Sequence, residues 1–193
     1  SAPDGVVGLG GWGSAPGILA ARARRIRCGL HEQNVAVGRA NRLLARWVDC
    51  VAVSFRETQA ALNGTPSVVT GMPVREAIGR PSQEGHAARF GFSDARPTLL
   101  ILGGSQGART INRLLIELVK RASTEERSRW QFLHVTGSAD EADVRKAYAR
   151  HQVTAWVAPF LVDMEAAYAQ ADVVITRAGA ATITELARCG KPA

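Results

Sequence analysis

The clearest structural signal in the sequence is Thr98-Leu99-Leu100-Ile101-Leu102-Gly103-Gly104-Ser105-Gln106-Gly107-Ala108. It begins as an apolar run of strand length and passes through a glycine-rich turn. Residues 108–121 follow, where Ile111, Leu115 and Leu118 recur at helical spacing. A strand, a glycine turn and a helix in this order form the repeating unit of a parallel α/β sheet. We therefore expect the same alternation along the rest of the chain.

The alternation of strands and helices does extend over most of the sequence. The expected strands are Gly5–Leu9, Cys28–His31, Cys50–Ser54, Ser67–Val69, Thr98–Leu102, Gln131–Val135, Val153–Ala158 and Val173–Thr176. The expected helices are Pro16–Arg25, Val37–Trp47, Phe55–Leu62, Ala108–Arg121, Ala139–Arg150, Asp163–Ala169 and Ala180–Arg188. Between them, residues 81–97 form a connector or a short irregular helix. The fold class is thus α/β, with two doubly wound halves: residues 1–75 and residues 76–193.

Composition and charge exclude several classes of protein. The chain has 193 residues, 46% of them hydrophobic, which is a globular composition. Three cysteines without CxxC spacing predict neither a disulfide framework nor a zinc site and favour a reducing cytoplasm. No apolar run approaches the roughly 18 residues of a membrane-spanning helix.

The basic excess is concentrated in the first part of the chain. The net charge is +7, and residues 1–75 carry nine basic and four acidic side chains. Arg22, Arg24, Arg25 and Arg27 could contact phosphates, nucleic acid or an anionic membrane. A compositional preference for arginine is the simpler explanation, and no RNA-binding motif supports nucleic acid.

The turn at Gly103–Ala108 has the chemistry of a diphosphate cradle. Its glycines allow the backbone to approach a ligand closely, and Ser105 adds a hydroxyl donor. It is not a Walker loop, since no Lys-Ser/Thr pair follows. The alternative is a tight turn that needs glycine only for its dihedral angles.

Two further glycine turns follow strands. Gly8–Gly13 matches GxGxxG formally, but Glu32 is a poor ribose ligand within its polar cluster, so a nicotinamide site is disfavoured. In Arg177–Glu185, free amides could meet an anion while Glu185 accepts hydrogen bonds from sugar hydroxyls. The alternative is that Thr182 and Glu185 form a capping box at the helix start.

The tetrad His31-Glu32-Gln33-Asn34 places four polar side chains just beyond a strand end. Ligands bind at such positions, although a solvated loop is equally compatible with the pattern. No third ligand stands at metal-like spacing, so we expect no metal site here.

Five motifs, in the same order and at nearly the same spacing, closely resemble the bacterial MurG family over essentially the whole chain. They are His31–Asn34 with Gly38 and Asn41-Arg42, Thr70–Arg75, Gly103–Ala108 with Asn112, Pro159–Met164, and Arg177–Glu185 with Gly190–Pro192. The resemblance implies a GT-B fold of two Rossmann-like domains. Residues 1–75 would be part of the acceptor and membrane-side domain, and residues 76–193 part of the UDP-N-acetylglucosamine (UDP-GlcNAc) domain. Both domains would be incomplete, and the sequence an internal segment of a longer protein.

The resemblance also implies roles for individual residues. Asn34 would contact the donor sugar, Arg75 the nucleotide at the interdomain junction, and Ser105 the diphosphate. The Phe160-Leu161 backbone would recognise uracil, and Glu185 the ribose. The donor phosphates and sugar would meet Ala180, Ala181, Thr182, Ile183 and Thr184, and the acceptor pyrophosphate would meet Gly10, Gly11, Trp12, Gly13 and Ser14.

The implied activity is that of an inverting, metal-independent hexosyltransferase without a cofactor. It would transfer N-acetylglucosamine from UDP-GlcNAc to the 4-hydroxyl of N-acetylmuramic acid in lipid I, giving lipid II for peptidoglycan synthesis at the cytoplasmic face of the bacterial plasma membrane. Of the residues in view, only His31 and Glu32 are candidates for the base; the resemblance places the base upstream of Ser1, so the isolated segment should be inactive. Two alternatives remain: another GT-B enzyme using UDP-GlcNAc, such as a 2-epimerase, or a non-catalytic remnant that binds nucleotide sugars.

Overall fold

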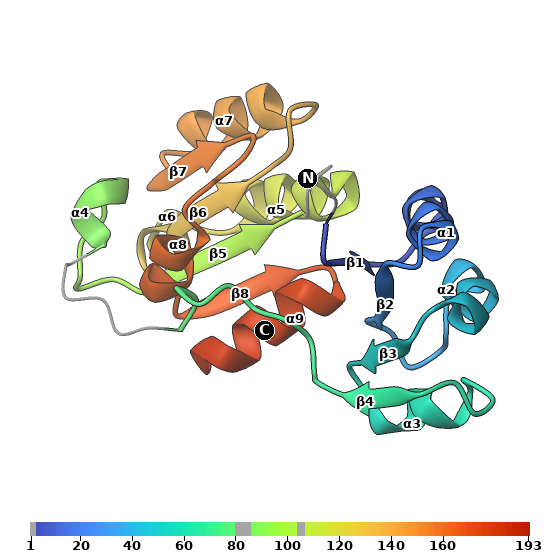
Figure 1. Cartoon of the computed structure of the whole chain (residues 1–193). Helices are drawn as coiled ribbons and strands as arrows, with labels where there is room; N and C mark the ends of the chain where they lie inside the picture. Colours follow the sequence, from blue (N-terminus) through green and yellow to red (C-terminus); the bar gives the residue numbers. More distant parts are fainter. Residues whose placement is uncertain (1–2, 80–85, 104–106) are drawn as a thin grey trace. The chain divides into compact units, whose positions relative to one another are not determined.

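A computed structural model describes residues 3–79, 86–103 and 107–193. The chain divides into unit 1, Ser1–Pro73, and unit 2, Val74–Ala193, and each unit contains its own parallel sheet (Figure 1). The division falls two residues before the boundary expected from the sequence, so Arg75 lies in unit 2. Cys28, Cys50 and Cys189 are free thiols.

Unit 1 contains a four-stranded parallel sheet in the order β1-β2-β3-β4. The strands are β1 (Gly5–Gly8), β2 (Arg27–Glu32), β3 (Cys50–Val53) and β4 (Ser67–Val69). The helices are α1 (Ala15–Ala23), α2 (Arg39–Leu44) and α3 (Arg56–Ala60), with 3-10 turns η1 (Trp12–Ser14) and η2 (Ala45–Trp47). Ile18 of α1 and Leu44 of α2 pack with Leu30 and Val51 of the sheet, and this apolar layer holds the ends of β1 and β2 in place.

Unit 2 contains a second four-stranded parallel sheet, in the order β7-β6-β5-β8. Its strands are β5 (Thr98–Leu102), β6 (Gln131–Val135), β7 (Ala155–Ala158) and β8 (Val173–Thr176). The chain runs outward from β5 to β7 and then returns to the other side of β5, where Leu102 pairs with Thr176. The strand order therefore reverses between β5 and β8, and open α/β sheets bind ligands at the carboxyl ends of such a pair.

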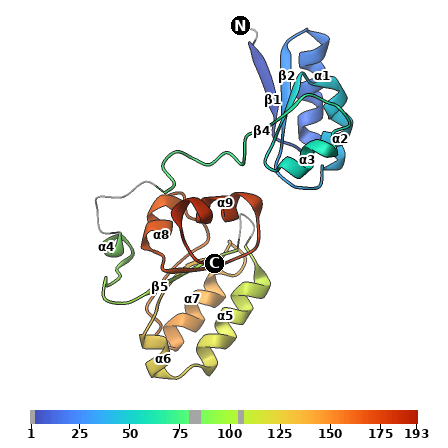
Figure 2. The same ribbon diagram turned by 90° about the horizontal axis from the view of Figure 1, so that it is seen from below.

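Helices cover both faces of the unit 2 sheet (Figure 2). On one face, Leu100 and Leu102 pack with residues of α8 (Met164–Gln170) and α9 (Ala180–Cys189). On the other, Ile101 packs with residues of α5 (Arg109–Arg121) and α7 (Glu141–Arg150). Successive side chains of β5 thus point to opposite faces of the sheet, and Leu100, Ile101 and Leu102 are all apolar because helices cover both faces.

The expected strands are all present, and the helices differ in detail. The stretch expected as one helix over 37–47 is divided into α2 and the 3-10 turn η2. Within residues 81–97, the described part holds the short helix α4 (Ala87–Phe90), and α6 (Thr124–Ser128) was not expected. A capping box at α6, formed by Ser123 and Glu126, is the local signal that could have revealed it.

No helix among the residues that the structure describes combines the length and apolarity needed to cross a membrane.

Candidate functional site

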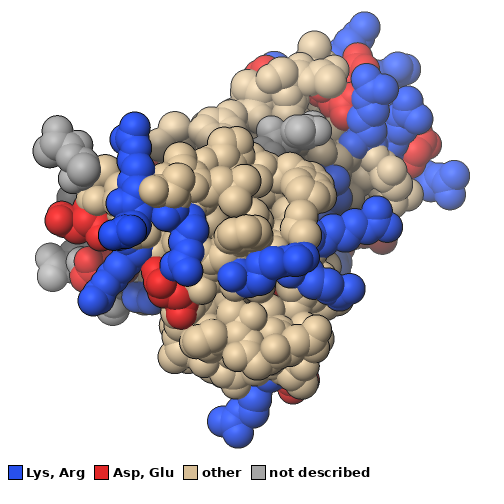
Figure 3. Space-filling view, turned by 45° about the vertical axis from the view of Figure 1, so that its right-hand side comes forward, with Lys and Arg blue, Asp and Glu red and all other residues tan. Residues whose placement is uncertain are grey.

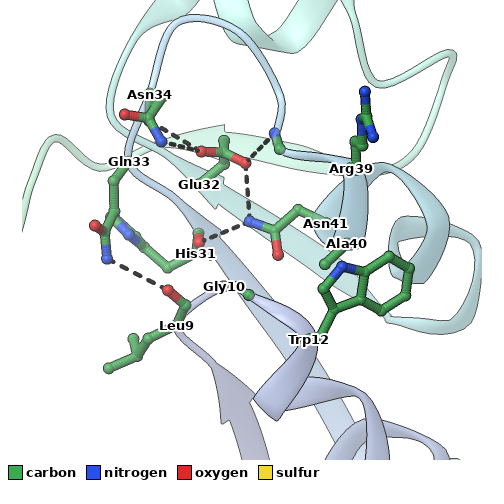
Figure 4. A pocket seen from close by; sticks show the side chains of 12 residues that line it. Leu9, Gly10, Trp12, His31, Glu32, Gln33, Asn34, Arg39, Ala40 and Asn41 are labelled. Atoms are coloured by element: carbon green, nitrogen blue, oxygen red, sulfur yellow. Dashed lines mark hydrogen bonds between the residues drawn. The ribbon is translucent and has the colours of Figure 1, made fainter.

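A cavity of about 310 Å³ opens in unit 1 at the carboxyl ends of β1 and β2. Its walls come from the loop after β1, the loop after β2 and the start of α2 (Figure 4). The structure thus brings the expected acceptor loop and the polar tetrad to one place. The lining residues are Leu9, Gly10, Gly11, Trp12, His31, Glu32, Gln33, Asn34, Gly38, Arg39, Ala40 and Asn41.

The buried carboxylate of Glu32 organises this cavity. One oxygen accepts from the backbone and side-chain amides of Asn34, at 3.0 and 3.2 Å. The other accepts from the Gly38 backbone and the Asn41 side chain, both at 2.9 Å. Burial favours the neutral acid, but these hydrogen bonds outweigh burial and keep the pKa of Glu32 below its ordinary value. With two donors on each oxygen, Glu32 has no lone pair left for proton transfer, which argues against Glu32 as the base.

The contact with Glu32 also orients the amide of Asn34. The nitrogen of that amide points at the carboxylate, so its oxygen is the atom available to a ligand (Figure 4). A hydroxyl or an amide N–H is the kind of group that such an oxygen accepts from.

His31 lies beside this cavity with one ring nitrogen already in use. Its Nε2 lies 3.1 Å from the carbonyl oxygen of Gly71, which can only accept, so the proton is on Nε2. Its Nδ1 is buried and has no hydrogen-bond partner among the described residues. His31 therefore keeps an unshared lone pair, whereas Glu32 does not.

The glycine loop of unit 1 is held by its own serine. Ser14 donates to the carbonyl of Gly10 at 2.9 Å, and both Gly10 and Gly11 have positive φ, at 96° and 74°. A side chain at these positions would be strained, so the loop requires glycine there. Gly10, Gly11 and Trp12 line the cavity, whereas Gly13 and Ser14 continue into η1 and are not among its lining residues.

A second cavity, of about 240 Å³, lies in unit 2 at the carboxyl ends of β5 and β6. It brings together five of the residues that the resemblance assigned to the nucleotide, from segments far apart in the chain: Arg75, Phe160, Leu161, Thr182 and Glu185. The remaining lining residues are mostly apolar: Leu102, Val135, Val162, Met164 and Tyr168. A mostly apolar hollow with a few convergent polar groups is typical of a small-molecule site.

The N-terminus of α9 supplies unpaired amides near this cavity. The helix begins at Ala180 after Gly179, and its first backbone bond runs from the Ile183 amide to the Gly179 carbonyl at 2.9 Å. The amides of residues 180–182 therefore have no helical acceptor and are suited to an anion. Thr184 uses its hydroxyl on the carbonyl of Ala180, at 2.8 Å.

Glu185 does not form the capping box that its spacing allowed. Thr182 lies inside α9 and not at its N-cap, because the N-cap is Gly179, three residues earlier. The Glu185 carboxylate instead accepts a hydrogen bond from the Tyr168 hydroxyl at 2.7 Å and pairs with Arg75 at 3.6 Å. Its role in the structure is at the cavity and not at the helix start.

The turn after β5 is tightly packed where it is described. A Cβ on Gly103 would lie 2.4 Å from the Ala108 nitrogen, and one on Gly107 2.4 Å from the Thr136 oxygen. Close packing thus requires both glycines, and the dihedral requirement that the tight-turn alternative named holds for Gly107, at φ 75°. Ser105, assigned to the diphosphate by the resemblance, lies outside the described residues.

A buried chain of hydrogen bonds holds α5 against β6 beneath this turn. Asn112 donates to the Thr136 carbonyl at 2.9 Å and to Asp140 at 2.8 Å, so its oxygen must accept the proton on Nε2 of His134, at 3.0 Å. Nδ1 of His134 then accepts from the Tyr148 hydroxyl at 2.9 Å. Burial lowers the pKa of His134 from 6.5 to about 4, which keeps the ring neutral.

Within the ranges that the structure covers, no group of three or more His, Cys, Asp or Glu side chains is arranged to hold a metal ion.

Comparison with known proteins assigns the two units to one family. The profile of the glycosyltransferase family 28 N-terminal domain matches residues 1–53, and that of the family 28 C-terminal domain matches residues 98–193. A relative from Syntrophotalea carbinolica, named UDP-N-acetylglucosamine--N-acetylmuramyl-(pentapeptide) pyrophosphoryl-undecaprenol N-acetylglucosamine transferase, is 43% identical over 99% of this chain. A relative of the same name from Geotalea uraniireducens is 43% identical over 98% of this chain.

The chain belongs to the MurG family. Among solved structures, the chain is similar to Acinetobacter baumannii MurG, with a TM-score of 0.65 at 33% identity. The match covers 95% of this chain and 49% of the MurG chain. The S. aureus MnaA-UDP co-structure has a TM-score of 0.62 at 15% identity, covering 92% and 54%, and shows only a common fold. The GT-B expectation is confirmed. The chain spans about half the length of these curated relatives, 51% in both cases.

Proposed function

We propose that the protein containing this chain transfers N-acetylglucosamine from UDP-GlcNAc to the 4-hydroxyl of the muramoyl sugar of lipid I, forming lipid II. The observation that carries the proposal is the unit 2 cavity, where Arg75, Leu161, Thr182 and Glu185 converge. That cavity lies where parallel sheets bind nucleotides. The relatives' names supply the sugar and the acceptor.

Unit 2 holds the donor in this proposal. The Phe160-Leu161 backbone recognises the uracil edge, and Glu185 accepts hydrogen bonds from the ribose. The free amides of Ala180, Ala181 and Thr182, at the positive end of α9, stabilise the diphosphate, aided by Ser105 and Arg75. Ile183 and Thr184 belong to the same turn, next to the donor phosphates and sugar.

Unit 1 holds the acceptor. Its glycine loop, Gly10–Ser14, faces the acceptor pyrophosphate, and the outward oxygen of Asn34 contacts the donor sugar.

The acceptor hydroxyl oxygen attacks the anomeric carbon as the bond from that carbon to the diphosphate oxygen breaks, which inverts the configuration. The hydroxyl proton passes to a base that is not assigned among these residues, and UDP leaves against the α9 amides.

A transfer assay tests the proposal. The protein that contains this chain is incubated with radiolabelled UDP-GlcNAc and a short-chain lipid I analogue, in the presence of EDTA. We expect label in the lipid product, a loss of about tenfold or more in Glu185→Gln, and little change in Glu117→Gln, which pairs with Lys120 on an exposed face of α5. Inversion of the donor sugar at C2 without transfer would identify an epimerase-like enzyme, and UDP-GlcNAc binding without turnover would identify a binding protein. Either result would contradict the proposal.

We further propose that unit 1 docks at the anionic cytoplasmic leaflet, where a lipid-linked acceptor is found. α1 lies beside α2 and η2. Leu19, Leu43 and Trp47 on these elements are 47%, 42% and 45% exposed, and Arg42 and Arg46 are exposed beside them. Exposed apolar groups flanked by arginine suit a membrane interface. Figure 3 shows basic side chains in several groups on the face it presents.

Co-sedimentation with vesicles tests this docking. Each arginine near an anionic surface contributes about 1 kcal/mol, so Arg42→Gln/Arg46→Gln should weaken binding to phosphatidylglycerol vesicles by roughly thirtyfold. The matched control is Arg113→Gln/Arg121→Gln on α5 of unit 2, which should change binding by less than about threefold. Equal binding to neutral and anionic vesicles would refute the docking proposal.

A further inference from the structure

The phenol of Tyr168 holds a carboxylate at the edge of the unit 2 cavity. Tyr168 is 2% exposed and lies on α8, and its hydroxyl donates to one oxygen of Glu185, on α9, at 2.7 Å. Burial and the neighbouring carboxylate both raise the pKa of Tyr168, so the phenol stays protonated and remains a donor. Both residues line the cavity.

Glu185 keeps hydrogen-bonding capacity after these contacts. An ionised carboxylate has about four lone-pair positions, of which Tyr168 occupies one. Arg75 lies 3.6 Å from the other oxygen, which is an ion pair and not a short hydrogen bond. The Glu185 side chain is 17% exposed, so the remaining positions can be reached from the cavity.

A carboxylate fixed in this way matches a vicinal diol. Two adjacent hydroxyls can each donate to it, provided that its plane cannot rotate away. The phenol fixes that plane from one side and the guanidinium from the other. A ligand lacking one hydroxyl would leave part of a desolvated carboxylate unpaired, which is costly.

We propose that Tyr168 is a positioning residue that makes the site selective for a ribonucleotide over a 2′-deoxyribonucleotide, by fixing the Glu185 carboxylate for both ribose hydroxyls. The inference rests on the proposed function, which places a uridine nucleotide in this cavity. It adds a residue that acts on the ligand only through Glu185.

The test compares the binding of UDP and 2′-deoxy-UDP by isothermal titration to the protein that contains this chain. We expect the wild type to prefer UDP by about tenfold or more, and Tyr168→Phe to reduce this preference to about threefold or less. Affinity for UDP should fall several-fold, and affinity for 2′-deoxy-UDP by less than about twofold. Phenylalanine fills the same space, and thermal melting confirms that the variant is folded.

Two further variants separate positioning from a general structural role. Tyr148→Phe removes a phenol that is equally buried but contacts His134, and should leave the UDP preference unchanged. Adding Tyr168→Phe to Glu185→Gln should not change the preference further, because Tyr168 acts through Glu185.

The outcomes distinguish the inference from the function on which it rests. A wild type that binds neither nucleotide shows that the proposed nucleotide site is wrong, and the inference falls with it. A wild type that prefers UDP, together with a Tyr168→Phe variant that keeps the whole preference or loses affinity for both nucleotides equally, overturns the inference alone.

Discussion

Glu32 shows how one side chain can determine the shape of a ligand loop. Four hydrogen bonds converge on its carboxylate from three residues, Asn34, Gly38 and Asn41. A polar residue at a strand end could be recognised in the sequence. The hydrogen-bond partners of Glu32 could not be recognised in the sequence, because they depend on how α2 packs. That packing sets the loop conformation that brings Gly38 and Asn41 back to Glu32.

Replacing Glu32 by glutamine should destabilise unit 1. An amide cannot accept all four hydrogen bonds and presents an NH₂ group to other donors, so we expect a loss of about 2–3 kcal/mol at pH 7. Because the pKa of Glu32 is lower in the folded protein than in the unfolded chain, its contribution to the free energy of unfolding is complete above pH 4.5. The contribution is lost as the pH falls through the folded pKa.

Chemical denaturation of the wild type and of Glu32→Gln as a function of pH measures this loss of stability. The variant should lack part of the acid sensitivity of the wild type below pH 4.5. Glu57→Gln, on the exposed first turn of α3, is the control and should change stability by less than about 0.5 kcal/mol. Parallel pH profiles for the wild type and Glu32→Gln would be incompatible with this role.

His134 predicts a second pH dependence, in unit 2. The pKa of His134 is about 4 in the folded protein and 6.5 for an exposed ring, so the unfolded chain takes up a proton at higher pH than the folded protein does. The free energy of unfolding should therefore fall by about 3 kcal/mol as the pH decreases from 6.5 to about 4. Below that pH, His134 should contribute no further loss of stability.

Thermal melts of His134→Gln across this pH range check the assignment. The variant should be less stable at pH 7, through its altered contacts with Asn112 and Tyr148, but lack the His134 part of the slope. His151→Gln, at the end of α7, should keep the wild-type slope. If both variants kept it, another group would be responsible.

At the scale of elements, the turns decide more than the helices do. The turn from β5 to α5 passes so close to β6 that Gly107, at φ 75°, has no room for a methyl group. Gly107→Ala should therefore destabilise the protein by about 3 kcal/mol or more.

The matched control is Gly17→Ala in α1, where the new methyl would meet nothing within 4 Å. Alanine is the better helix former, so this change should stabilise the protein by about 0.5–1 kcal/mol. Urea denaturation measures both variants. A Gly107→Ala protein as stable as the wild type would show that the turn can move away from Thr136.

The elements themselves were largely predictable, because period and turn chemistry are local. β5 and β6 have the expected bounds, since each is an apolar run between clear breaks. The starts and ends of helices were less predictable. Thr182 and Glu185 have capping-box spacing, yet α9 begins after Gly179, so no capping box forms there. The role of Glu185 is set instead by a tertiary contact, the hydrogen bond from the Tyr168 hydroxyl.

At the scale of the whole molecule, the chain consists of two parallel-sheet units, each with a cavity at the carboxyl ends of its strands. Motif order was enough to identify the family, because five short strings at fixed spacing seldom coincide by chance. Tyr168 was not predicted: in sequence it is one apolar position of an amphipathic helix, and only the packing of α8 against α9 brings it to Glu185.

In the function that we propose, unit 2 binds uridine diphosphate through the amides at the start of α9 and the Glu185 carboxylate, without a metal ion. A crystal of the protein that contains this chain, soaked with UDP in the presence of EDTA, tests it most directly. We predict uracil beside Phe160-Leu161, both ribose hydroxyls within about 3 Å of Glu185, and the diphosphate against residues 180–182. Nucleotide found in another cavity, or bound only when a divalent cation is supplied, would contradict the account.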